Sequence, residues 1–419
     1  MGAHLPVLDF THFEGPIYWF YNIDQEQRWN QSRVFPAVTD LEQMKLVYQQ
    51  EQQLFYLAQP NHCILLRHKP DPQYLRYLEL SGIVLPGLLS LSEITDEVPW
   101  ADIPGIQSAL IVPYLVNEEI QSTAVTCGAK VYGCQAEIVK KSNDKFYVRK
   151  WAKENSFSVT EGYFCNNVNE LEDAYKRLTD KGFAQCVLKI PYGSSGKGIR
   201  VIDNTRTFKH IKNFISKRNQ SFELLLEGWH PICRSLNCQL LIKENEIKVL
   251  AVTEQHIDAN GVYLGTDFTP KYDINLKEKY EQEMIRLGKL LQRQGYNGIA
   301  GVDSILDKTG LLIPIIEINA RFTQVTYLLP VIQHLKSNYL FIQSCFIKIE
   351  TEYELSFNEL YEKVRLYLNV RNDDFFVYTF AKSVLENKTI YRIFFLFYGN
   401  DLDIVKSCVN KIHQFQDAI

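Results

Sequence analysis

Paired cysteines are missing from this sequence: its nine cysteines are spread singly between Cys63 and Cys408, without a C-x-x-C pair. A structural zinc site usually takes such pairs, so we expect reduced thiols that are mostly buried. Cys233 and Cys238 lie closest together, but no histidine follows them at ligand spacing, and we assign both to the core. Unpaired thiols are typical of a reducing compartment, which favours a cytoplasmic protein.

Long runs of basic or apolar residues are also missing. The formal net charge is −4, and no field of lysine and arginine is present that could neutralise a nucleic-acid backbone, so we expect no nucleic-acid partner. No stretch is long enough to span a bilayer, and the first ten residues lack the pattern of a secretion signal. We therefore expect no membrane association. The longest aromatic-rich run, 391–398, is short and favours a buried strand.

The length of the chain favours more than one domain. With 419 residues, of which 46% are hydrophobic, it can bury more than one core,. Strands at 17–21, 63–66 and 109–112 and a helix at 40–57 indicate a small α/β domain over residues 1–130. No internal repeat is present, and no Pro/Gly/Ser linker separates independent modules.

Four glutamines fall within the predicted helix 40–57, at Gln49, Gln50, Gln52 and Gln53. Apolar residues recur around them at the spacing of a helix. We therefore interpret the glutamines as a solvated helix face rather than as a low-complexity segment.

After residue 133 the pattern changes to alternating helices, strands and hairpins. We predict helices at 143–154, 169–181, 208–216 and 276–294, and strands at 184–190, 199–202, 222–227, 236–242 and 247–252. A further hairpin covers 299–319 and turns at 307–310. The last helix has an apolar stripe of Tyr280, Met284, Leu287 and Leu291 and ends at Gly295. Residues 351–419 show helix and strand patterns but no recognisable chemistry.

A glycine-rich loop, PYGSSGKG, runs from Pro191 to Gly198 between two predicted strands. Glycine tolerates positive φ and has no Cβ, so such a loop lets backbone N–H groups approach phosphate oxygens. It is not a P-loop, because Gly198 follows Lys197 where Ser or Thr is needed. It is not a Rossmann fingerprint either, because a strand follows it. The loop is typical of a lid over a triphosphate, with a solvated surface hairpin as the alternative.

Polar residues alternate along the hairpin 299–319. Asp303 lies on the first strand, and Glu317, Asn319 and Arg321 share one face at the end of the second. Carboxylate and amide oxygens are ligands that Mg²⁺ prefers, and an arginine stabilises charge on a transferring phosphoryl group. A half-exposed strand is the alternative, which fits Glu317 alone better than the whole set. A simple hairpin does not pair Asp303 with Glu317, so we expect a bulge or a wider turn.

Together, these elements resemble the ATP-grasp family in order and approximate spacing over residues 130–335. The elements are Lys145, the loop from Lys189 to Gly198, the strand ending at Glu227, and the hairpin with Asp303, Glu317 and Asn319. A looser similarity covers Val252–Phe268 and the preceding α/β region. It is to the branch with a pre-ATP-grasp domain, which contains pheganomycin-type peptide ligases and the butirosin carrier-protein glutamate ligase.

This resemblance implies an α/β (α+β) protein with an N-terminal pre-ATP-grasp α/β domain. An ATP-grasp fold follows, in which two α+β subdomains clasp ATP, and a small C-terminal α+β segment ends the chain. The implied boundaries are 1–130 for the first domain, 131–230 for the nucleotide-binding subdomain with its phosphate lid, 231–350 for the metal and substrate subdomain, and 351–419 for the C-terminal extension.

The resemblance also implies a nucleotide site. Lys145 and Lys189 would bind the α- and β-phosphates, and Glu227 would hold the adenine with the backbone of Trp229 and His230. The residues that would close over the triphosphate are Gly193, Ser194, Ser195, Gly196, Lys197 and Gly198. The family usually places an acid soon after the adenine-binding strand to bind the ribose, but none occurs here between Glu227 and Glu244. Ser235 or Asn237 could replace it, with ordinary structural hydrogen bonding as the favoured alternative.

The metal site and the acceptor site are implied in the same way. Asp303, Glu317 and Asn319 resemble the magnesium ligands, with Glu317 bridging two ions, for which Mn²⁺ can substitute. Arg321 would steady the γ-phosphate or the acyl phosphate, so the catalytic residues would be Arg321, Lys189 and Glu317. The tentative substrate residues are Glu254, Tyr263, Gly265 and Arg321, and a salt bridge is an equal alternative for Glu254.

The function implied is that of an ATP-dependent carboxylate-amine ligase that forms an acyl phosphate. We expect an amino acid to be joined to a peptide-like or small amine in specialised metabolism, with ATP and Mg²⁺ as cofactors. Such chemistry needs positioning and charge neutralisation rather than a protein nucleophile. One alternative acceptor is the thiol of an acyl carrier protein, which a basic surface would favour. The candidate surface is Lys140, Lys141, Lys145, Arg149, Lys150 and Lys153. A second alternative is a nucleotide-binding protein without turnover.

Overall fold

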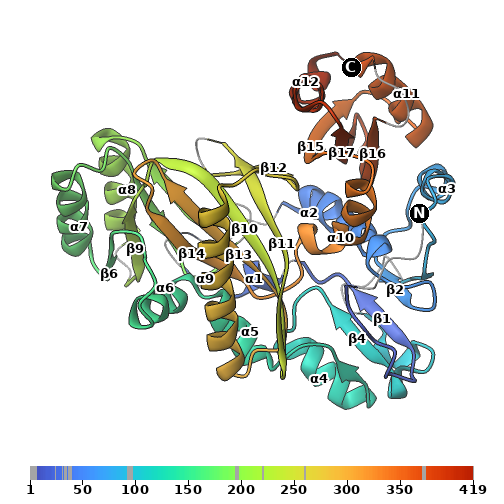
Figure 1. The fold of residues 1–419 in the computed structure, drawn as a ribbon, viewed down its shortest axis with the longest axis horizontal. Helices are drawn as coiled ribbons and strands as arrows, with labels where there is room; N and C mark the ends of the chain where they lie inside the picture. Colours follow the sequence, from blue (N-terminus) through green and yellow to red (C-terminus); the bar gives the residue numbers. More distant parts are fainter. Residues whose placement is uncertain are drawn as a thin grey trace.

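Three β-sheets form the framework of the protein in a computed structural model (Figure 1). The structure describes residues 7–23, 25–30, 32, 35, 40–91, 98–193, 198–218, 221–258, 261–369 and 374–418. One sheet is parallel and two are antiparallel, and helices pack against them. This mixed architecture confirms the predicted fold class. No helix of the described residues is long and apolar enough to cross a membrane.

The N-terminal sheet is parallel and five-stranded, in the order β3-β2-β1-β4-β5. Its strands are β1 (Ile17–Phe20), β2 (Cys63–Leu66), β3 (Gly87–Ser90), β4 (Leu110–Pro113) and β5 (Lys130–Val131). Every residue of β1 and β4 is buried, as expected of parallel strands covered on both faces. The helices of this region are α1 (Gln25–Arg28), α2 (Leu41–Tyr48), α3 (Pro72–Leu80) and α4 (Glu118–Cys127), and a 3₁₀ helix, η1 (Gln49–Tyr56), continues α2. The predicted strands and helix of this region are confirmed.

The second sheet is antiparallel and four-stranded, in the order β6-β9-β7-β8. Its strands are β6 (Gly162–Cys165), β7 (Cys186–Lys189), β8 (Ile199–Ile202) and β9 (Leu224–Gly228), and α7 (Val168–Asp180) and α8 (Thr205–Arg218) share its core. Two helices, α5 (Ala136–Asn143) and α6 (Lys145–Glu154), precede it. The strands β7 and β8 pair as a hairpin around the glycine-rich loop, as predicted.

The third sheet is antiparallel and has eight strands, in the order β14-β13-β10-β11-β12-β15-β17-β16. The strands are β10 (Ile232–Lys243), β11 (Glu246–Ile257), β12 (Tyr263–Asp267), β13 (Gly298–Asp307), β14 (Leu312–Asn319), β15 (Phe341–Thr351), β16 (Phe375–Val384) and β17 (Thr389–Gly399). The predicted run 391–398 is thus a buried strand. Residues 351–419 contribute β17 and β16, which extend this sheet beyond β15.

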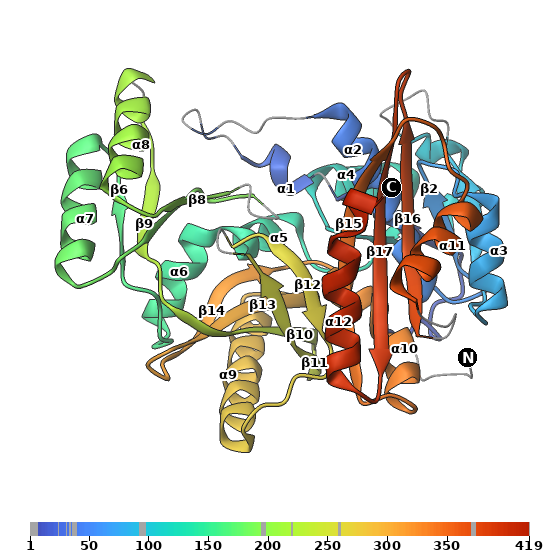
Figure 2. The ribbon, with the colours of Figure 1, turned by 90° about the horizontal axis from the view of Figure 1, so that it is seen from above.

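Four helices accompany the eight-stranded sheet: α9 (Ile274–Arg293), α10 (Gln324–Lys336), α11 (Phe357–Leu368) and α12 (Leu402–His413). The predicted stripe of α9 is confirmed, because Tyr280, Met284, Leu287 and Leu291 are all buried. Gly295 has a φ of 87° and ends this helix as expected,. Figure 2 shows α12 lying along β15 and β17.

All nine cysteines are free, and five of them are buried. The assignment of both Cys233 and Cys238 to the core was wrong, because Cys233 is exposed while Cys238 is buried. Cys238 lies in the buried middle of β10, whereas Cys233 lies near its start, where the register with β13 shifts between Ile232 and Arg234.

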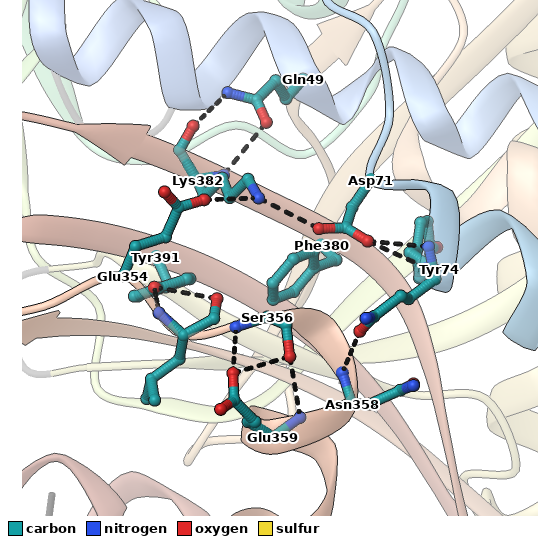
Figure 3. Close-up of polar contacts among 12 residues, drawn as sticks. Gln49, Asp71, Tyr74, Glu354, Ser356, Asn358, Glu359, Phe380, Lys382 and Tyr391 are labelled. Carbon is teal, nitrogen blue, oxygen red and sulfur yellow. Dashed lines mark hydrogen bonds and ion pairs between the residues drawn. The ribbon is translucent and has the colours of Figure 1, made fainter.

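The interpretation of the glutamines as a solvated face was also wrong. Gln49, Gln52 and Gln53 are buried. The Gln52 amide donates to the carbonyl of Phe380 at 2.9 Å and accepts from its N–H at 2.8 Å. The Gln49 amide makes the same pair of bonds with Lys382, at 2.8 and 3.0 Å (Figure 3).

These amides complete the edge of the eight-stranded sheet. The outward N–H and C=O groups of an edge strand such as β16 lack a partner strand, and a primary amide supplies one donor and one acceptor. A nearby ion-pair network adds a second connection, because Lys382 Nζ lies 3.0 Å from Asp71 and 2.9 Å from Glu354 (Figure 3). The N-terminal region and the C-terminal strands are thereby joined by polar contacts.

We predict that Gln52→Ala lowers the free energy of unfolding by about 2 kcal/mol or more, because it leaves two buried backbone groups of Phe380 unpaired at about 1–3 kcal/mol each. Gln50, which is only half-buried, provides the matched control, Gln50→Ala. Urea unfolding of both variants measures the difference. Equal stability of the two variants would contradict the role of the amide.

Candidate functional site

A pocket lies between the four-stranded sheet and β14. It is lined by Lys145, Val148, Arg149, Val159, Thr160, Lys189, Leu225, Glu227, Ile315 and Ile316. Charged side chains and branched apolar side chains share this lining, which suits a ligand with a flat apolar part and an anionic part. Of the predicted nucleotide residues, the structure brings Lys145, Lys189 and Glu227 together here.

Glu227 holds the cationic side of the pocket in place. Its carboxylate lies 2.6 Å from Lys189 Nζ and 2.7 Å from Arg149 Nε, and it accepts a hydrogen bond from Thr160. Burial raises the pKa of the Glu227 carboxyl, but Lys189 and Arg149 outweigh burial and hold the pKa at about 2. Glu227 is therefore ionised at neutral pH, and it orients Lys189 from the neighbouring strand.

The predicted adenine contacts lie at the end of β9. The Trp229 N–H already donates to the carbonyl of Gln185 at 2.9 Å. His230 is anchored through its ring, with Nδ1 3.2 Å from the Asp307 carboxylate. Among the described residues no carbonyl accepts a hydrogen bond from the backbone N–H of His230, which leaves it available to a ligand.

Lys145 connects the glycine-rich loop to the carboxylate hairpin. It is the first residue of α6, which Asp144 caps by accepting from two backbone N–H groups. Its Nζ donates to the Gly193 carbonyl at 2.7 Å and lies 2.8 Å from Glu317. Only the two ends of the predicted loop, Gly193 and Gly198, can be placed. Ser194, Ser195, Gly196 and Lys197 lie outside the described residues.

Asp303 and Glu317 lie directly opposite each other on β13 and β14. The expected bulge is confirmed, because the register of the two strands shifts between Asp303 and Ile305. Asp303 accepts hydrogen bonds from Asn237 at 2.7 Å, Gln255 at 2.9 Å and Asn319 at 3.1 Å. Burial and the nearby Glu317 carboxylate raise the pKa of Asp303 to about 6.

Asp303 and Glu317, together with Asn319, are called the carboxylate rung below. The chemistry of this rung fits a divalent cation. Two carboxylates face each other in a mostly buried position, and the raised pKa of Asp303 reflects burial together with their mutual repulsion,. Lys145 is the cation that contacts them among the described residues, through Glu317. Two carboxylates and one amide form the predicted ligand set. The described residues contain no cluster of three or more His, Cys, Asp or Glu that could hold a metal alone, so the magnesium ligands stay a prediction.

Arg321 is held by a residue that the sequence did not indicate. Its Nε donates to Glu26 of α1 at 2.7 Å, and a terminal nitrogen donates to Asn319 Oδ1 at 2.7 Å. The guanidinium lies 5.0 Å from the ring centre of Tyr114. Burial lowers the pKa of Arg321, but Glu26 outweighs it and the pKa is raised. Glu26 lies 295 residues earlier in the chain, and no local pattern predicts such a pair.

The tentative ribose and acceptor residues are largely occupied by structural contacts. Asn237 donates to Asp303, and Glu254 accepts from Arg234 at 2.7 and 2.8 Å, which is the salt bridge left open as an alternative. The Tyr263 hydroxyl pairs with Thr266 at 2.8 Å. A Cβ at Gly265 would lie 2.0 Å from the Ser344 carbonyl, so this glycine allows β12 and β15 to approach.

Comparison with known proteins identifies the family. A family model described as an ATP-grasp domain matches residues 142–325. The chain is 40% identical over 395 residues to butirosin acyl-carrier-protein L-glutamate ligase from Niallia circulans, covering 93% of this chain and 92% of the relative. The chain belongs to the ATP-grasp family. It is therefore an ATP-dependent ligase, as predicted.

Solved structures of ATP-grasp enzymes share this fold. N5-carboxyaminoimidazole ribonucleotide synthetase bound to ADP superimposes with a TM-score of 0.57 at 14% identity, covering 97% of this chain and 98% of that chain. Biotin carboxylase from Campylobacter jejuni gives a TM-score of 0.55 at 12% identity, covering 94% and 90%. At these identities the similarity concerns the fold alone.

We predict that binding of Mn²⁺ weakens by about tenfold between pH 7 and pH 5. Asp303 is ionised above its pKa of about 6 and neutral below it, and a cation binds the ionised form. Electron paramagnetic resonance titration of free Mn²⁺ measures the affinity. The Asp303→Asn variant should bind Mn²⁺ weakly at both pH values. A wild-type affinity for Mn²⁺ that does not change with pH would contradict the assignment of Asp303 as a metal ligand.

We also predict that Lys189→Ala weakens ATP binding by at least tenfold, because it removes the cation that Glu227 orients toward the pocket. Isothermal titration with ATP measures the affinity. Lys181→Ala is the matched control, since Lys181 pairs with Glu161 at 2.7 Å in an exposed position. Equal ATP affinity of the two variants would refute a phosphate contact by Lys189.

Proposed function

We propose that this ligase activates the carboxylate of an amino acid as an acyl phosphate and transfers the acyl group to the thiol of an acyl carrier protein. The observation that carries the proposal is the extent of the similarity to the carrier-protein glutamate ligase. It covers 93% of the chain and so continues well beyond residues 142–325 of the common ATP-grasp domain. Substrate selection is expected to reside in those flanking regions, and L-glutamate is the first amino acid to test.

The reaction has two steps. A carboxylate oxygen of the amino acid attacks the γ-phosphorus, and the bond from that phosphorus to the leaving oxygen of ADP breaks. The sulfur of the carrier thiolate then attacks the acyl carbon, and the carbon–oxygen bond to phosphate breaks and releases inorganic phosphate. The thiol proton passes to solvent. Neither step forms a bond to the ligase itself.

The residues of this chain act by binding and by neutralising charge. Lys189 and Lys145 line the pocket and would bind the phosphates, and Arg321 donates a hydrogen bond to Asn319. Asp303, Glu317 and Asn319 would hold Mg²⁺, which neutralises phosphate charge when bound. Lys145 and Glu227 are buried, and buried surroundings would limit the access of water to the acyl phosphate.

A thiol acceptor on a carrier protein is also supported by the surface of α5 and α6. Carrier proteins are acidic, and Lys141, Lys150 and Lys153 are exposed here. Lys145 and Arg149 do not belong to this surface, because they line the pocket. From the sequence we expected an amine, rather than a thiol, to accept the acyl group from the same acyl phosphate. An amine acceptor is therefore the second candidate for this function.

The test is release of phosphate from ATP with a panel of amino acids, with hydroxylamine present to trap the acyl phosphate as a hydroxamate. We predict hydroxamate formation with L-glutamate and, when a carrier protein with its thiol arm is supplied, a mass increase of that carrier. Glu317→Gln should lose at least a hundredfold in turnover, because it removes a charge from the metal rung. Phosphate release without a hydroxamate for any acid would contradict acyl-phosphate chemistry.

One further result distinguishes the thiol acceptor from the amine acceptor, and another provides a control for Glu317→Gln. Transfer to small amines with no loading of any carrier would favour the amine acceptor. Glu246→Gln is the control for Glu317→Gln, since Glu246 is exposed and lies at the β10–β11 turn. This control should keep wild-type turnover.

A further inference from the structure

Gln239 of β10 is a polar side chain with no exposure to solvent, since its exposed fraction is 0%. It lies two residues after Asn237 and therefore on the same face of the sheet. Asn237 is the register partner of Asp303, and Gln239 is the register partner of Gly301 on the same strand, β13. Gln239 thus lies next to the pair of Asn237 and Asp303, and any effect of Gln239 on a ligand must pass through its neighbours.

A glycine on β13 makes room for the amide of Gln239. A Cβ at Gly301 would lie 3.1 Å from Nε2 of Gln239 and 2.7 Å from Cγ2 of Thr323. A side chain at this position would therefore push the amide and the start of α10 away from the sheet. The close approach of α10 to this face depends on the glycine.

The amide oxygen of Gln239 accepts two hydrogen bonds from the start of α10. The hydroxyl of Thr323 donates at 2.8 Å, and the hydroxyl of Thr326 donates at 2.7 Å. The two threonines also form the capping box of this helix, in which each hydroxyl oxygen accepts the backbone N–H of the other residue. Because these oxygens accept from the helix, their protons are left to donate to Gln239.

The other end of the amide leads to the carboxylate rung. Gln239 Nε2 donates to Asn237 Oδ1 at 2.7 Å, and Asn237 Nδ2 donates to Asp303 Oδ1 at 2.7 Å. An ionised carboxylate accepts hydrogen bonds and cannot donate them, so the NH₂ group of Asn237 must face Asp303. The Asn237 oxygen must then face Gln239, and the Gln239 oxygen must face the threonines. The chain of hydrogen bonds through Thr323 and Thr326, Gln239, Asn237 and Asp303 is called the amide relay below.

The amide relay holds one particular oxygen of Asp303. Oδ1 accepts from Asn237 and also from Gln255, at 2.9 Å. Among the described residues, Oδ2 accepts only from Asn319, at 3.1 Å. Oδ2 is therefore the oxygen on the side of the carboxylate rung, and the hydrogen bonds to Oδ1 keep the carboxylate in this orientation.

The amide relay also links Asp303 to the positive end of a helix. The N–H groups at a helix N-terminus carry partial positive charge, and hydrogen bonds in a chain polarise one another. Since α10 begins three residues after Arg321, the relay joins the carboxylate of Asp303 to the segment that carries this arginine. Both polar ends of the site are thus connected through one buried amide.

We propose that Gln239 is a positioning residue for the metal site: it orients Asn237, which holds Oδ1 of Asp303 and leaves Oδ2 to bind a divalent cation. The proposal rests on the proposed function, because it takes Asp303 as a metal ligand. Groups that hydrogen-bond to metal ligands typically contribute about 10–100-fold to metal affinity. Gln239 has this effect without touching the cation, the nucleotide or the amino acid.

The test replaces Gln239 by methionine, which fills similar space and supplies no N–H donor. In Gln239→Met the Asn237 amide loses the partner that orients it, so the Kd for Mn²⁺ should rise about tenfold. Electron paramagnetic resonance of free Mn²⁺ measures this Kd. The affinity for ATP in the presence of EDTA should match wild type in isothermal titration, since Lys189 and Glu227 lie on the four-stranded sheet.

Thr326 tests the far end of the amide relay with a conservative pair of variants. Thr326→Val keeps the shape of threonine and removes the hydroxyl, so the Kd for Mn²⁺ should rise. The rise should be smaller than in Gln239→Met, because Thr323 still donates to the same oxygen. Thr326→Ser keeps the hydroxyl and should bind Mn²⁺ as wild type does. This pair decides the question if Gln239→Met does not fold.

Ser304→Ala is the control for a general loss of buried hydrogen bonds. Ser304 follows Asp303 on β13 and so points to the opposite face of the sheet. Its hydroxyl donates to the carbonyl of Pro314 at 2.7 Å and pairs with the hydroxyl of Tyr280 at 2.8 Å. This variant should melt at a lower temperature than wild type and keep the wild-type affinity for Mn²⁺.

Three results would overturn the proposal. The first is a folded Gln239→Met that binds Mn²⁺ as tightly as wild type, or equal affinities of Thr326→Val and Thr326→Ser. The second is a loss of Mn²⁺ affinity in Ser304→Ala as large as in Gln239→Met. The third is wild-type Mn²⁺ affinity in Asp303→Asn, because Asp303 would then not be a metal ligand.

Failure of the proposed function gives a different result. If wild type forms no hydroxamate with any amino acid while Gln239→Met still weakens Mn²⁺ binding, acyl-phosphate chemistry is wrong and the positioning role of Gln239 stands. If wild type forms the hydroxamate and Gln239→Met binds Mn²⁺ normally, the ligase stands and the positioning role is wrong.

Discussion

The contact of Lys145 with Glu317 is the interaction on which the site depends. The half-buried pair of Asp303 and Glu317, which lie opposite each other, carries repulsion that hydrogen bonds from neutral amides reduce only in part. The ammonium of Lys145 supplies positive charge at this position, and its second bond, to the Gly193 carbonyl, fixes the start of the glycine-rich loop. One side chain therefore connects the glycine-rich loop with the carboxylates of β13 and β14. Asp144 caps the N-terminus of α6 and so fixes the position of Lys145, the first residue of that helix.

The N-terminal region contributes direct contacts to Arg321. Glu26 of α1 pairs with Arg321, and the rings of Tyr21 and Tyr114, which follow β1 and β4, lie beside that arginine. The carboxyl ends of parallel strands are where α/β sheets place ligands. The pocket around Glu227, in contrast, is lined by residues of the four-stranded sheet, α6 and β14. The pocket around Glu227 and the contacts of Arg321 thus come from regions far apart in the chain.

The sequence predicted what depends on neighbours in the chain. The stripe of α9, the hairpin with Asp303 opposite Glu317 and the bulge between them follow from periodicity and residue type. The pairs that hold Arg321 and that cap β16 could not be predicted, because their members lie about 300 residues apart. The buried glutamines were wrongly predicted to be solvated, because an amide side chain hydrogen-bonds equally well to water and to the backbone of an edge strand. The triad of Arg149, Thr160 and Glu227 was missed because a charged helix looks the same in solvent and in a pocket.

The capping of β16 also constrains the order in which the chain can acquire its structure. Gln49 and Gln52 precede their backbone partners by 333 and 328 residues. During synthesis these amides emerge long before the strand that they cap, so the first sheet can form early while its contact with the last hairpin waits for nearly the whole chain. Contacts of such separation carry a large loop-closure cost and slow folding. Completion of the sheet edge is therefore a late event, and a chain stopped before residue 380 would leave the glutamines without the backbone groups they pair with.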